Sequence, residues 1–491
     1  MHTDTCDVLV IGAGGAGLRA GLAAIEAAPD IHVALVTKGS LGQSGVTATA
    51  CSDRMAFHAT LKHTKPGGPD NWRYHAEDIY RIGGCVSDGD LAAILARGAQ
   101  AAFDYLDALG VPFVKRDGLA DQFVTDGSKY ARACYTGPHT ANHIEQALVR
   151  RIRQTSIELV EDAMLVDLLL TSDGAQVAGA VILASNEIKA IRAKAIVLAT
   201  GGVGEAFEVN VYPPGMTGDG YAGALRAGAE LINMEFIQIG LSSVKTKLAC
   251  SGSMMRAIPR VINDQDEEFL ARYFPVGTPP GQVYSVLFAK GASWPVSLEE
   301  KSHIMDIAVF REMVAGRKVY LDYSRNPHGF DPSALDGKAT RWFKEAKGVD
   351  LTHVLNAPTP LARLKAINPQ SVAWLQARGI DMDAGDKVEI APAIQHFQGG
   401  VKIRTEGNTN LKGLYAAGEV AGGQHGANRP GGNALLDTQV FGKVAGSSAA
   451  SFAAATALPP TDVARLAAVQ TKISGMQTAR GLGAGAARKQ L

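Results

Sequence analysis

The chain alternates short apolar runs with glycine-rich turns and with segments rich in alanine and leucine. Its first unit, CDVLVIGAGGAGLRAGLAAIEA at residues 6–27, predicts a buried strand, a glycine turn and a helix in that order. A second apolar run, IHVALVTKG at residues 31–39, predicts another strand. A strand, a helix and a second strand closely joined are typical of an α/β, Rossmann-like nucleotide fold.

The glycine turn after the first strand has the spacing GxGxxG, filled by Gly12, Gly14 and Gly17. Glycines there let the backbone approach a pyrophosphate, which then rests on the positive end of the helix. The alternative, a glycine turn that binds nothing, is disfavoured by the strand before it and the helix after it. The sequence therefore predicts dinucleotide contacts at Gly12, Ala13, Gly14, Gly15, Ala16 and Gly17.

The second strand lacks the acidic residue of a typical nicotinamide dinucleotide site. In such sites an Asp or Glu near the strand end holds the ribose hydroxyls. Residues 31–50 contain neither, and Thr37 and Lys38 occupy the place. We therefore expect FAD rather than NAD, since several flavoproteins carry this variation.

The composition argues against several classes of protein. Lys+Arg and Asp+Glu are both 48 among 491 residues, so net charge gives no reason to expect nucleic acid as a partner. No window reaches the roughly 18 apolar residues of a spanning helix, and no basic segment precedes an apolar one at the N-terminus. The five cysteines are scattered without a CxxC pair, which argues against a metal or iron–sulfur site. We expect a cytoplasmic protein with reduced thiols and no transmembrane segment.

Several longer blocks resemble one family of flavoproteins. They are VIGAGGAG (10–17), LVTKGS (35–40), NWRYHAEDI (71–79), AKAIVLATGG (193–202), TGDGYAGALRAGAELINMEFIQ (217–238) and GLYAAGEVAGGQHGANRPGGNALLDTQVFGKVAG (413–446). In this order they make the chain similar to the flavoprotein subunit of the succinate dehydrogenase/fumarate reductase family, which also includes L-aspartate oxidase. The last two blocks are specific enough to exclude most other flavoproteins.

The resemblance implies an α/β, Rossmann-like FAD-binding domain of the glutathione-reductase type with an inserted α+β capping domain. The FAD-binding domain is expected at residues 1–240 and again at 386–450, with the cap at 241–385 between its two parts. A cap that leaves the FAD domain and returns to it can close over a flavin. Residues 451–491 are expected to form one helix with a frayed end.

The resemblance also implies FAD contacts beyond the glycine turn. Thr37 and Lys38 would lie by the adenosine ribose, and Glu419 would accept hydrogen bonds from the ribityl chain. The other implied contacts are Gly39, Ser44, Gly45, Ala163, Thr200, Gly201, Asp219, Asn433 and Leu435. Dehydrogenases of the family tether FAD through a histidine shortly after the second strand, but this chain has none between His32 and His58. We therefore expect non-covalent FAD.

The catalytic part of the resemblance is incomplete. The family holds a dicarboxylate with two histidines, a Thr–Glu pair and an arginine, while a second arginine in the cap delivers a proton. Arg429 and the neighbouring His425 are present. The other positions fall on Gly240, Ser251, Gly252, Ser302 and Gln395. The sequence therefore predicts that the protein is neither a fumarate reductase nor a succinate dehydrogenase.

Other side chains are candidates to bind or protonate the substrate. They are Lys301, His303, His396 and Arg256, each with the alternative of an ordinary surface, capping or ion-pair role. Tyr212 and Tyr284 are further candidates that the sequence does not rank.

The leading interpretation is an FAD-dependent oxidoreductase that transfers hydride between flavin N5 and a small carboxylate-bearing organic acid or amino acid. Arg429 would grip one carboxylate through two hydrogen bonds. One alternative is a flavoprotein electron-transfer subunit that works with a separate iron–sulfur partner. Another is a flavin-binding protein whose catalytic site has decayed.

Overall fold

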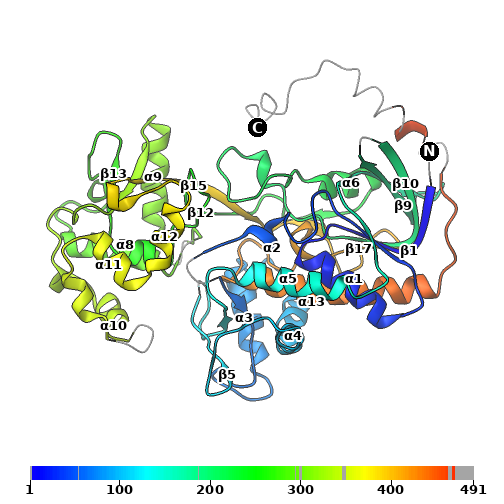
Figure 1. Ribbon diagram of the computed structural model, residues 1–491, viewed down its shortest axis with the longest axis horizontal. Coiled ribbons are helices and arrows are strands. Elements are labelled where there is room, and N and C mark those ends of the chain that lie inside the picture. Colours follow the sequence, from blue (N-terminus) through cyan, green and yellow to red (C-terminus); the bar gives the residue numbers. More distant parts are fainter. Residues whose placement is uncertain are drawn as a thin grey trace.

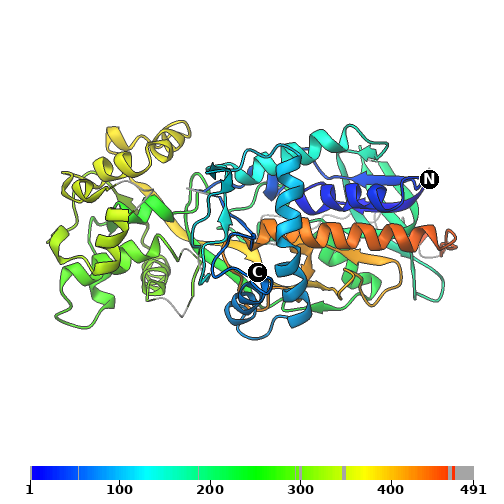
Figure 2. The ribbon, with the colours of Figure 1, turned by 90° about the horizontal axis from the view of Figure 1, so that it is seen from below.

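The computed structural model describes residues 3–52, 55–125, 127–185, 187–293, 295–297, 301–345, 350–462, 467–469 and 471. They form two parts that lie side by side along the long axis of the molecule, as both Figure 1 and Figure 2 show. Each part has its own hydrophobic core. Two neighbouring strands, β12 (Ile237–Ser243) and β15 (Val388–Phe397), run from one part into the other.

The larger part is built on a sheet with the strand order β7-β2-β1-β10-β9-β8, and β17 pairs with the end of β10. β1 is parallel to β2 and β10, whereas β9 is antiparallel to β10 and β8. The first predicted strand becomes β1, and its Val8, Leu9 and Val10 are fully buried because both faces of the sheet are covered. The strands are β1 (Thr3–Ile11), β2 (Val33–Val36), β7 (Glu158–Val160), β8 (Ala163–Leu170), β9 (Val177–Ala184), β10 (Glu187–Leu198) and β17 (Leu414–Ala416).

Helices α1 (Gly15–Ala27) and α13 (Asn433–Ala454) lie against β1 and β10 and against each other. They approach closely because small residues meet at their interface: a Cβ added to Gly446 would lie 2.2 Å from the Ala20 carbonyl oxygen. The other helices of this part are α2 (Val46–Thr49), α3 (Trp72–Ile82), α4 (Gly89–Ala108), α5 (Thr140–Ile152) and α6 (Asp219–Ala227). Its short strands are β3 (Phe57–His58), β4 (Lys115–Arg116), β5 (Leu119–Ala120), β6 (Ala133–Cys134), β11 (Leu231–Ile232), β16 (Gly400–Lys402) and β18 (Ala421–Gly422).

The smaller part, called the cap from here on, contains an antiparallel sheet in the order β12-β15-β14-β13. Its core draws on residues from Leu241 to Ile390. The remaining cap elements are β13 (Arg260–Asn263), β14 (Val319–Asp322), α7 (Gly252–Arg256), α8 (Pro280–Lys290), α9 (His303–Val314), α10 (Gly337–Glu345), α11 (Pro360–Ile367) and α12 (Pro369–Gln376). This arrangement confirms the predicted α/β, Rossmann-like fold with an inserted α+β cap. The boundaries at 240 and 385 stay a prediction, since β12 begins before the first of them.

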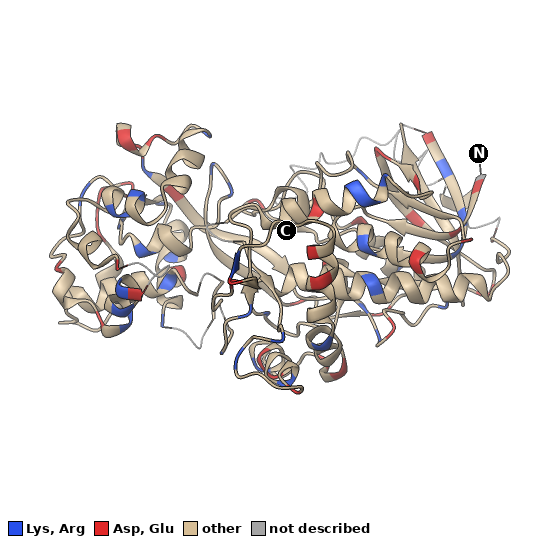
Figure 3. Cartoon of the chain, turned by 60° about the horizontal axis from the view of Figure 1, so that its bottom comes forward, with Lys and Arg blue, Asp and Glu red and all other residues tan. Residues whose placement is uncertain are grey.

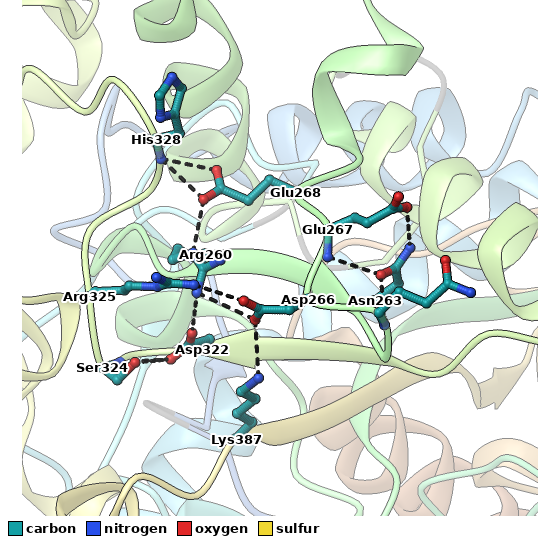
Figure 4. A network of polar contacts seen from close by, with 11 residues as sticks. Arg260, Asn263, Asp266, Glu267, Glu268, Asp322, Ser324, Arg325, His328 and Lys387 are labelled. Carbon is teal, nitrogen blue, oxygen red and sulfur yellow. Dashed lines mark hydrogen bonds and ion pairs between the residues drawn. The ribbon is translucent and has the colours of Figure 1, made fainter.

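A network of ion pairs ties strands β13, β14 and β15 of the cap together (Figure 4). Arg260 on β13 lies 2.7 Å from Asp322 on β14 and 2.9 Å from Glu268. Asp266 follows β13 and pairs with Lys387, next to the start of β15, at 3.3 Å. None of these residues lines the cavity described below, so we assign the network to the stability of the cap.

Charges of both signs are spread over both parts of the molecule (Figure 3), in keeping with the equal numbers of basic and acidic residues. Within the described ranges, no helix combines the length and the apolar character needed to cross a membrane. The same residues include no group of three or more His, Cys, Asp or Glu placed to hold a metal ion. The helix predicted at 451–491 lies mostly outside the described residues; α13 itself ends at Ala454.

Candidate active site

A cavity of about 1050 Å³ lies between the larger part and the cap, and residues of both parts line it. The larger part contributes the turn after β1, the residues that follow β10 and the segment that leads into α13. The predicted cofactor residues that line the cavity are Gly12, Ala13, Gly14, Gly15, Ala16, Thr37, Lys38, Gly39, Ser44, Gly45, Ala163, Thr200, Gly201, Asp219, Glu419 and Leu435. Gly17 and Asn433 belong to the same region but do not line it.

The three glycines of the turn have different physical roles. Gly12 has φ of +109°, and an added Cβ would lie 2.1 Å from the Ala199 carbonyl oxygen. A Cβ on Gly17 would lie 1.7 Å from the Gly12 carbonyl oxygen, so Gly17 lets α1 pack against the turn. Around Gly14 the nearest described atom to an added Cβ is Thr47 Oγ1 at 3.6 Å. An added Cβ at Gly14 would make only an ordinary contact, and Gly14 lines the cavity at the start of α1, where a pyrophosphate fits.

Lys38 and Asp219 form an ion pair in the cavity wall. Lys38 Nζ lies 2.7 Å from Asp219 Oδ2 and 2.6 Å from Thr217 Oγ1. The sequence suggested separate dinucleotide contacts for the two residues, and the structure shows that they also contact each other. The pairing follows from the turn before α6, which brings Asp219 next to the end of β2.

Glu419 lies in the cavity wall, in the short turn Gly418–Val420 that follows β17. Its Oε1 accepts a hydrogen bond from the Tyr212 hydroxyl. The same oxygen accepts a second hydrogen bond, of 2.9 Å, from the Phe397 backbone N–H. Burial raises the pKa of Glu419 to about 7, although these two hydrogen bonds act in the opposite direction. Such a carboxyl group is suited to accept further hydrogen bonds, for example from sugar hydroxyls. Tyr212 is thus a support for Glu419, a role that the sequence did not indicate.

Asn433, the first residue of α13, is fully buried. Its Oδ1 accepts hydrogen bonds from His58 Nδ1 at 2.5 Å and from His75 Nε2 at 3.0 Å. Burial lowers the pKa of His75 to about 3 and that of His58 well below its usual value, so both rings are neutral. Among the described residues, no acceptor contacts the Asn433 Nδ2 group. A buried amide donor of this kind fits an acceptor supplied by a ligand.

Arg429 and His396 line the cavity, and their side chains are 7% and 6% exposed. Burial, and then the positive charge of Arg429, hold the pKa of His396 well below its usual value. The Gln398 amide nitrogen lies 3.2 Å from His396 Nδ1. His425 is outside the cavity lining: its ring centre is 5.9 Å from that of His396, and its Nε2 is 3.8 Å from Asp437 Oδ2. The structure thus brings Arg429 and His396 to the cavity and leaves His425 behind its wall.

Among the cap candidates, Arg256 lines the cavity, whereas Lys301 and His303 do not. Lys301 is exposed, and His303 is the first residue of α9. Ser302 stands where the resemblance places a proton-delivering arginine; it is 2% exposed and hydrogen bonded to Ser293. This turn buries the residue between Lys301 and His303, and a catalytic role for either of the two stays a prediction.

Two of the remaining positions also lie away from the cavity. The Tyr284 hydroxyl donates to the His328 carbonyl oxygen inside the cap. Gly240 is on β12 and does not line the cavity. Ser251, Gly252 and Gln395, where the resemblance places further dicarboxylate ligands, do line it.

The cap contributes cavity residues that the sequence reasoning missed. They are Lys247, Trp342, Trp374 and Arg378. No motif marks them, because they come from three separate segments of the cap, with Trp374 and Arg378 in the same one, and these segments meet only in the folded chain.

The chain is similar in sequence to known flavoproteins. The family model described as "FAD binding domain" matches residues 7–435. The chain is 32% identical over 456 residues to one subunit of the fumarate reductase (CoM/CoB) of Methanothermobacter marburgensis, covering 91% of this chain and 72% of that protein. It is 30% identical over 464 residues to an L-aspartate oxidase of Streptomyces coelicolor, covering 92% and 69% of the two.

Solved structures share the fold. A quinol-fumarate reductase structure with menaquinol superposes with a TM-score of 0.73 and 24% identity, covering 100% of this chain and 79% of that chain. The Mycobacterium smegmatis Sdh1 complex with UQ1 gives a TM-score of 0.67 at 28% identity, covering 96% and 73% of the two chains.

Proposed function

This chain belongs to the FAD binding domain family and is an FAD-dependent oxidoreductase, and we propose that its substrate is a small organic acid or amino acid. The observation that carries this proposal is the buried guanidinium of Arg429 in the cavity wall. A planar guanidinium can grip a carboxylate through two parallel hydrogen bonds, and burial strengthens such a contact. Bound FAD supplies hydride transfer to or from its N5 position.

The residues of the larger part fit FAD. The cavity beside Gly14 can take the pyrophosphate, which the first backbone amides of α1 would bind. Glu419 can accept hydrogen bonds from the sugar hydroxyls, and the Asn433 Nδ2 group can donate to a carbonyl of the ring system. These three groups line or adjoin one cavity, which supports a single extended dinucleotide along it.

We propose that FAD is held without a covalent bond. His32 lies at the surface, where its Nε2 is 2.9 Å from Glu158 Oε2. His58 is fully buried, and both of its ring nitrogens already contact Asn433 and Ser128. The histidines on either side of the expected attachment point are therefore engaged elsewhere.

His396 would help Arg429 to orient the substrate. Because its Nδ1 accepts a hydrogen bond from the Gln398 amide, a neutral His396 carries its proton on Nε2 and can donate it to a substrate oxygen. Ser251, Gly252 and Ser302 offer hydroxyls or no side chain where fumarate reductases carry a Thr–Glu pair and a proton-delivering arginine. We therefore propose that fumarate and succinate are not the substrates.

Anaerobic mixing tests the proposal directly. The purified flavoprotein is mixed with single mono- and dicarboxylates and amino acids while the absorbance of the flavin is followed. We expect one of these acids to bleach the oxidised flavin, or to restore the colour of the reduced flavin. Arg429→Gln should slow that reaction by at least about tenfold at unchanged flavin content. An absence of reaction with every acid, or full activity in Arg429→Gln, would contradict the proposal.

A second candidate function is an electron-transfer subunit that works with a separate iron–sulfur protein. Several similar proteins are described as flavoprotein subunits, which favours this reading. In addition, Ile307, Phe310 and Val314 expose an apolar stripe on α9 that a partner could cover. Bleaching of the flavin only by a reduced partner protein, and by none of the acids, would favour this function.

A further inference from the structure

The cap residues that line the cavity, called the cap wall here, indicate the shape of the substrate. All of the predicted FAD contacts come from the larger part, so the cap wall faces whatever else the cavity holds. Its most distinctive members are Arg256, Trp342, Trp374 and Arg378.

Two guanidinium–indole stacks stand in this wall. The Cζ atom of Arg256 lies 4.7 Å from the centre of the Trp342 ring, and that of Arg378 lies 3.7 Å from the centre of the Trp374 ring. Trp342 is itself anchored in the cap core by Phe343, at 5.0 Å between ring centres. Arg256 and Trp342 are half-buried, whereas Arg378 is exposed beside the half-buried Trp374. A guanidinium over the face of an indole is attracted to the ring, while its edge can still donate hydrogen bonds.

The cap wall is also positively charged. Lys247 adds a third cation, and its Nζ is held by the Tyr212 carbonyl oxygen at 2.5 Å. Among the described residues of the cap wall, none is an aspartate or a glutamate. Such a wall favours an anion over a neutral or cationic ligand.

Small residues make up much of the rest of this wall. Ala249, Ser251, Gly252, Gly291 and Ala292 all belong to the cap wall. The cap wall therefore combines two planar indoles and two guanidinium groups with small residues. This surface suits a planar group better than a short flexible chain.

We propose that the substrate is a planar aromatic acid with a second acidic group. One carboxylate would bind at Arg429, the ring would lie against the indole and guanidinium planes of the cap wall, and the second acidic group would reach Arg256. The inference rests on the proposed function, because it uses Arg429 as the first anchor. A short aliphatic dicarboxylate would leave Trp342 and Trp374 without a role.

The test measures binding by the change in flavin absorbance of the FAD-loaded protein. Benzoate is compared with cyclohexanecarboxylate, which has the same charge and nearly the same size but no planar ring. Benzene-1,4-dicarboxylate is then compared with benzoate. We expect benzoate to bind at least about tenfold more tightly than its saturated counterpart, and the aromatic dianion more tightly still. Affinities for benzoate and cyclohexanecarboxylate within about threefold of each other would overturn the inference.

Substitutions assign the effect to the cap wall. Trp342→Leu and Trp374→Leu should each reduce the preference for benzoate, and Arg256→Gln should remove the gain from the second acidic group. Trp72→Leu is the matched control, because Arg97 stacks on Trp72 at 4.0 Å outside the cavity. A ring preference that survives both cap substitutions, or one that Trp72→Leu reduces equally, would overturn the inference.

Arg429→Lys separates this inference from the proposed function. If the variant weakens every carboxylate while no ring preference exists in the wild type, only the inference about the substrate ring fails. If the variant weakens none of the acids, the proposed function fails, and the inference fails with it. Flavin content and melting temperature are measured for every variant, so that a loss of folding is recognised as such.

Discussion

Replacing Gly14 by alanine should separate cofactor binding from folding. Gly14 has φ of −77°, which alanine adopts freely, and an added Cβ would make only an ordinary contact of 3.6 Å with Thr47 Oγ1. We therefore expect the free energy of unfolding of the FAD-free protein to change by less than about 0.5 kcal/mol. The methyl group would occupy the space assigned to the pyrophosphate. Losing one charge-assisted hydrogen bond costs about 1.5–3 kcal/mol, so the Kd for FAD should rise roughly 10- to 150-fold.

Gly17→Ala is the matched contrast. Its Cβ would lie 1.7 Å from the Gly12 carbonyl oxygen, a distance that forces the turn or α1 to move. We expect the free energy of unfolding to fall by about 1–3 kcal/mol or more, with FAD binding lost in consequence. Urea unfolding of the FAD-free proteins, followed by circular dichroism, gives the stabilities, and quenching of FAD fluorescence gives the Kd values. The different roles assigned to the two glycines would be refuted if Gly14→Ala unfolds as readily as Gly17→Ala, or if Gly14→Ala binds FAD like the wild type.

Three further predictions concern the cofactor and the reaction. The folded FAD-free protein binds a proton at Glu419 more tightly than the unfolded chain does, because the pKa of Glu419 is raised to about 7 in the folded state. The free energy of unfolding should therefore fall by up to about 3 kcal/mol as the pH rises from about 4.5 to 7. Urea unfolding of Glu419→Gln should not show this pH dependence. Acid precipitation should release all of the flavin into the supernatant, and colour retained on the washed pellet would show a covalent bond. The turnover number for fumarate reduction with an artificial electron donor should be at least about 100-fold below the order of 10 s⁻¹ that is usual for enzymes. A turnover number in the usual range would mean that other residues replace the missing arginine and Thr–Glu pair.

The sequence was most informative where chemistry is local. Gly12, Gly14 and Gly17 indicate the turn because their spacing alone decides where the backbone can bend and approach a phosphate. The buried strand before them is equally local, since its run of apolar residues needs no partner to be recognised. These features were sufficient to predict the α/β fold, and the position of the dinucleotide that they predict stays a prediction.

The sequence was less informative where distant segments meet. Tyr212 contacts Glu419 across about two hundred residues of chain, and no spacing rule links them. Lys301 and His303 are basic and flank the position expected for the cap arginine, but neither of them lines the cavity. Trp342 and Trp374 look like ordinary core residues in the sequence. Only the packing of the cap shows that they face the cavity.

A ligand titration of the Arg429→Lys variant tests the central claim most directly. Both wild type and variant are loaded with FAD, and the Kd for the best-binding carboxylate is read from the flavin absorbance. Lysine keeps the charge but loses the planar pair of donors, so we expect the Kd to rise at least about thirtyfold, which corresponds to about 2 kcal/mol. Arg272→Lys, on the cap surface with a 2.9 Å ion pair to Glu267, is the control and should leave the Kd unchanged. An unchanged Kd in Arg429→Lys, at equal flavin content and melting temperature, would contradict the claim that Arg429 holds the substrate.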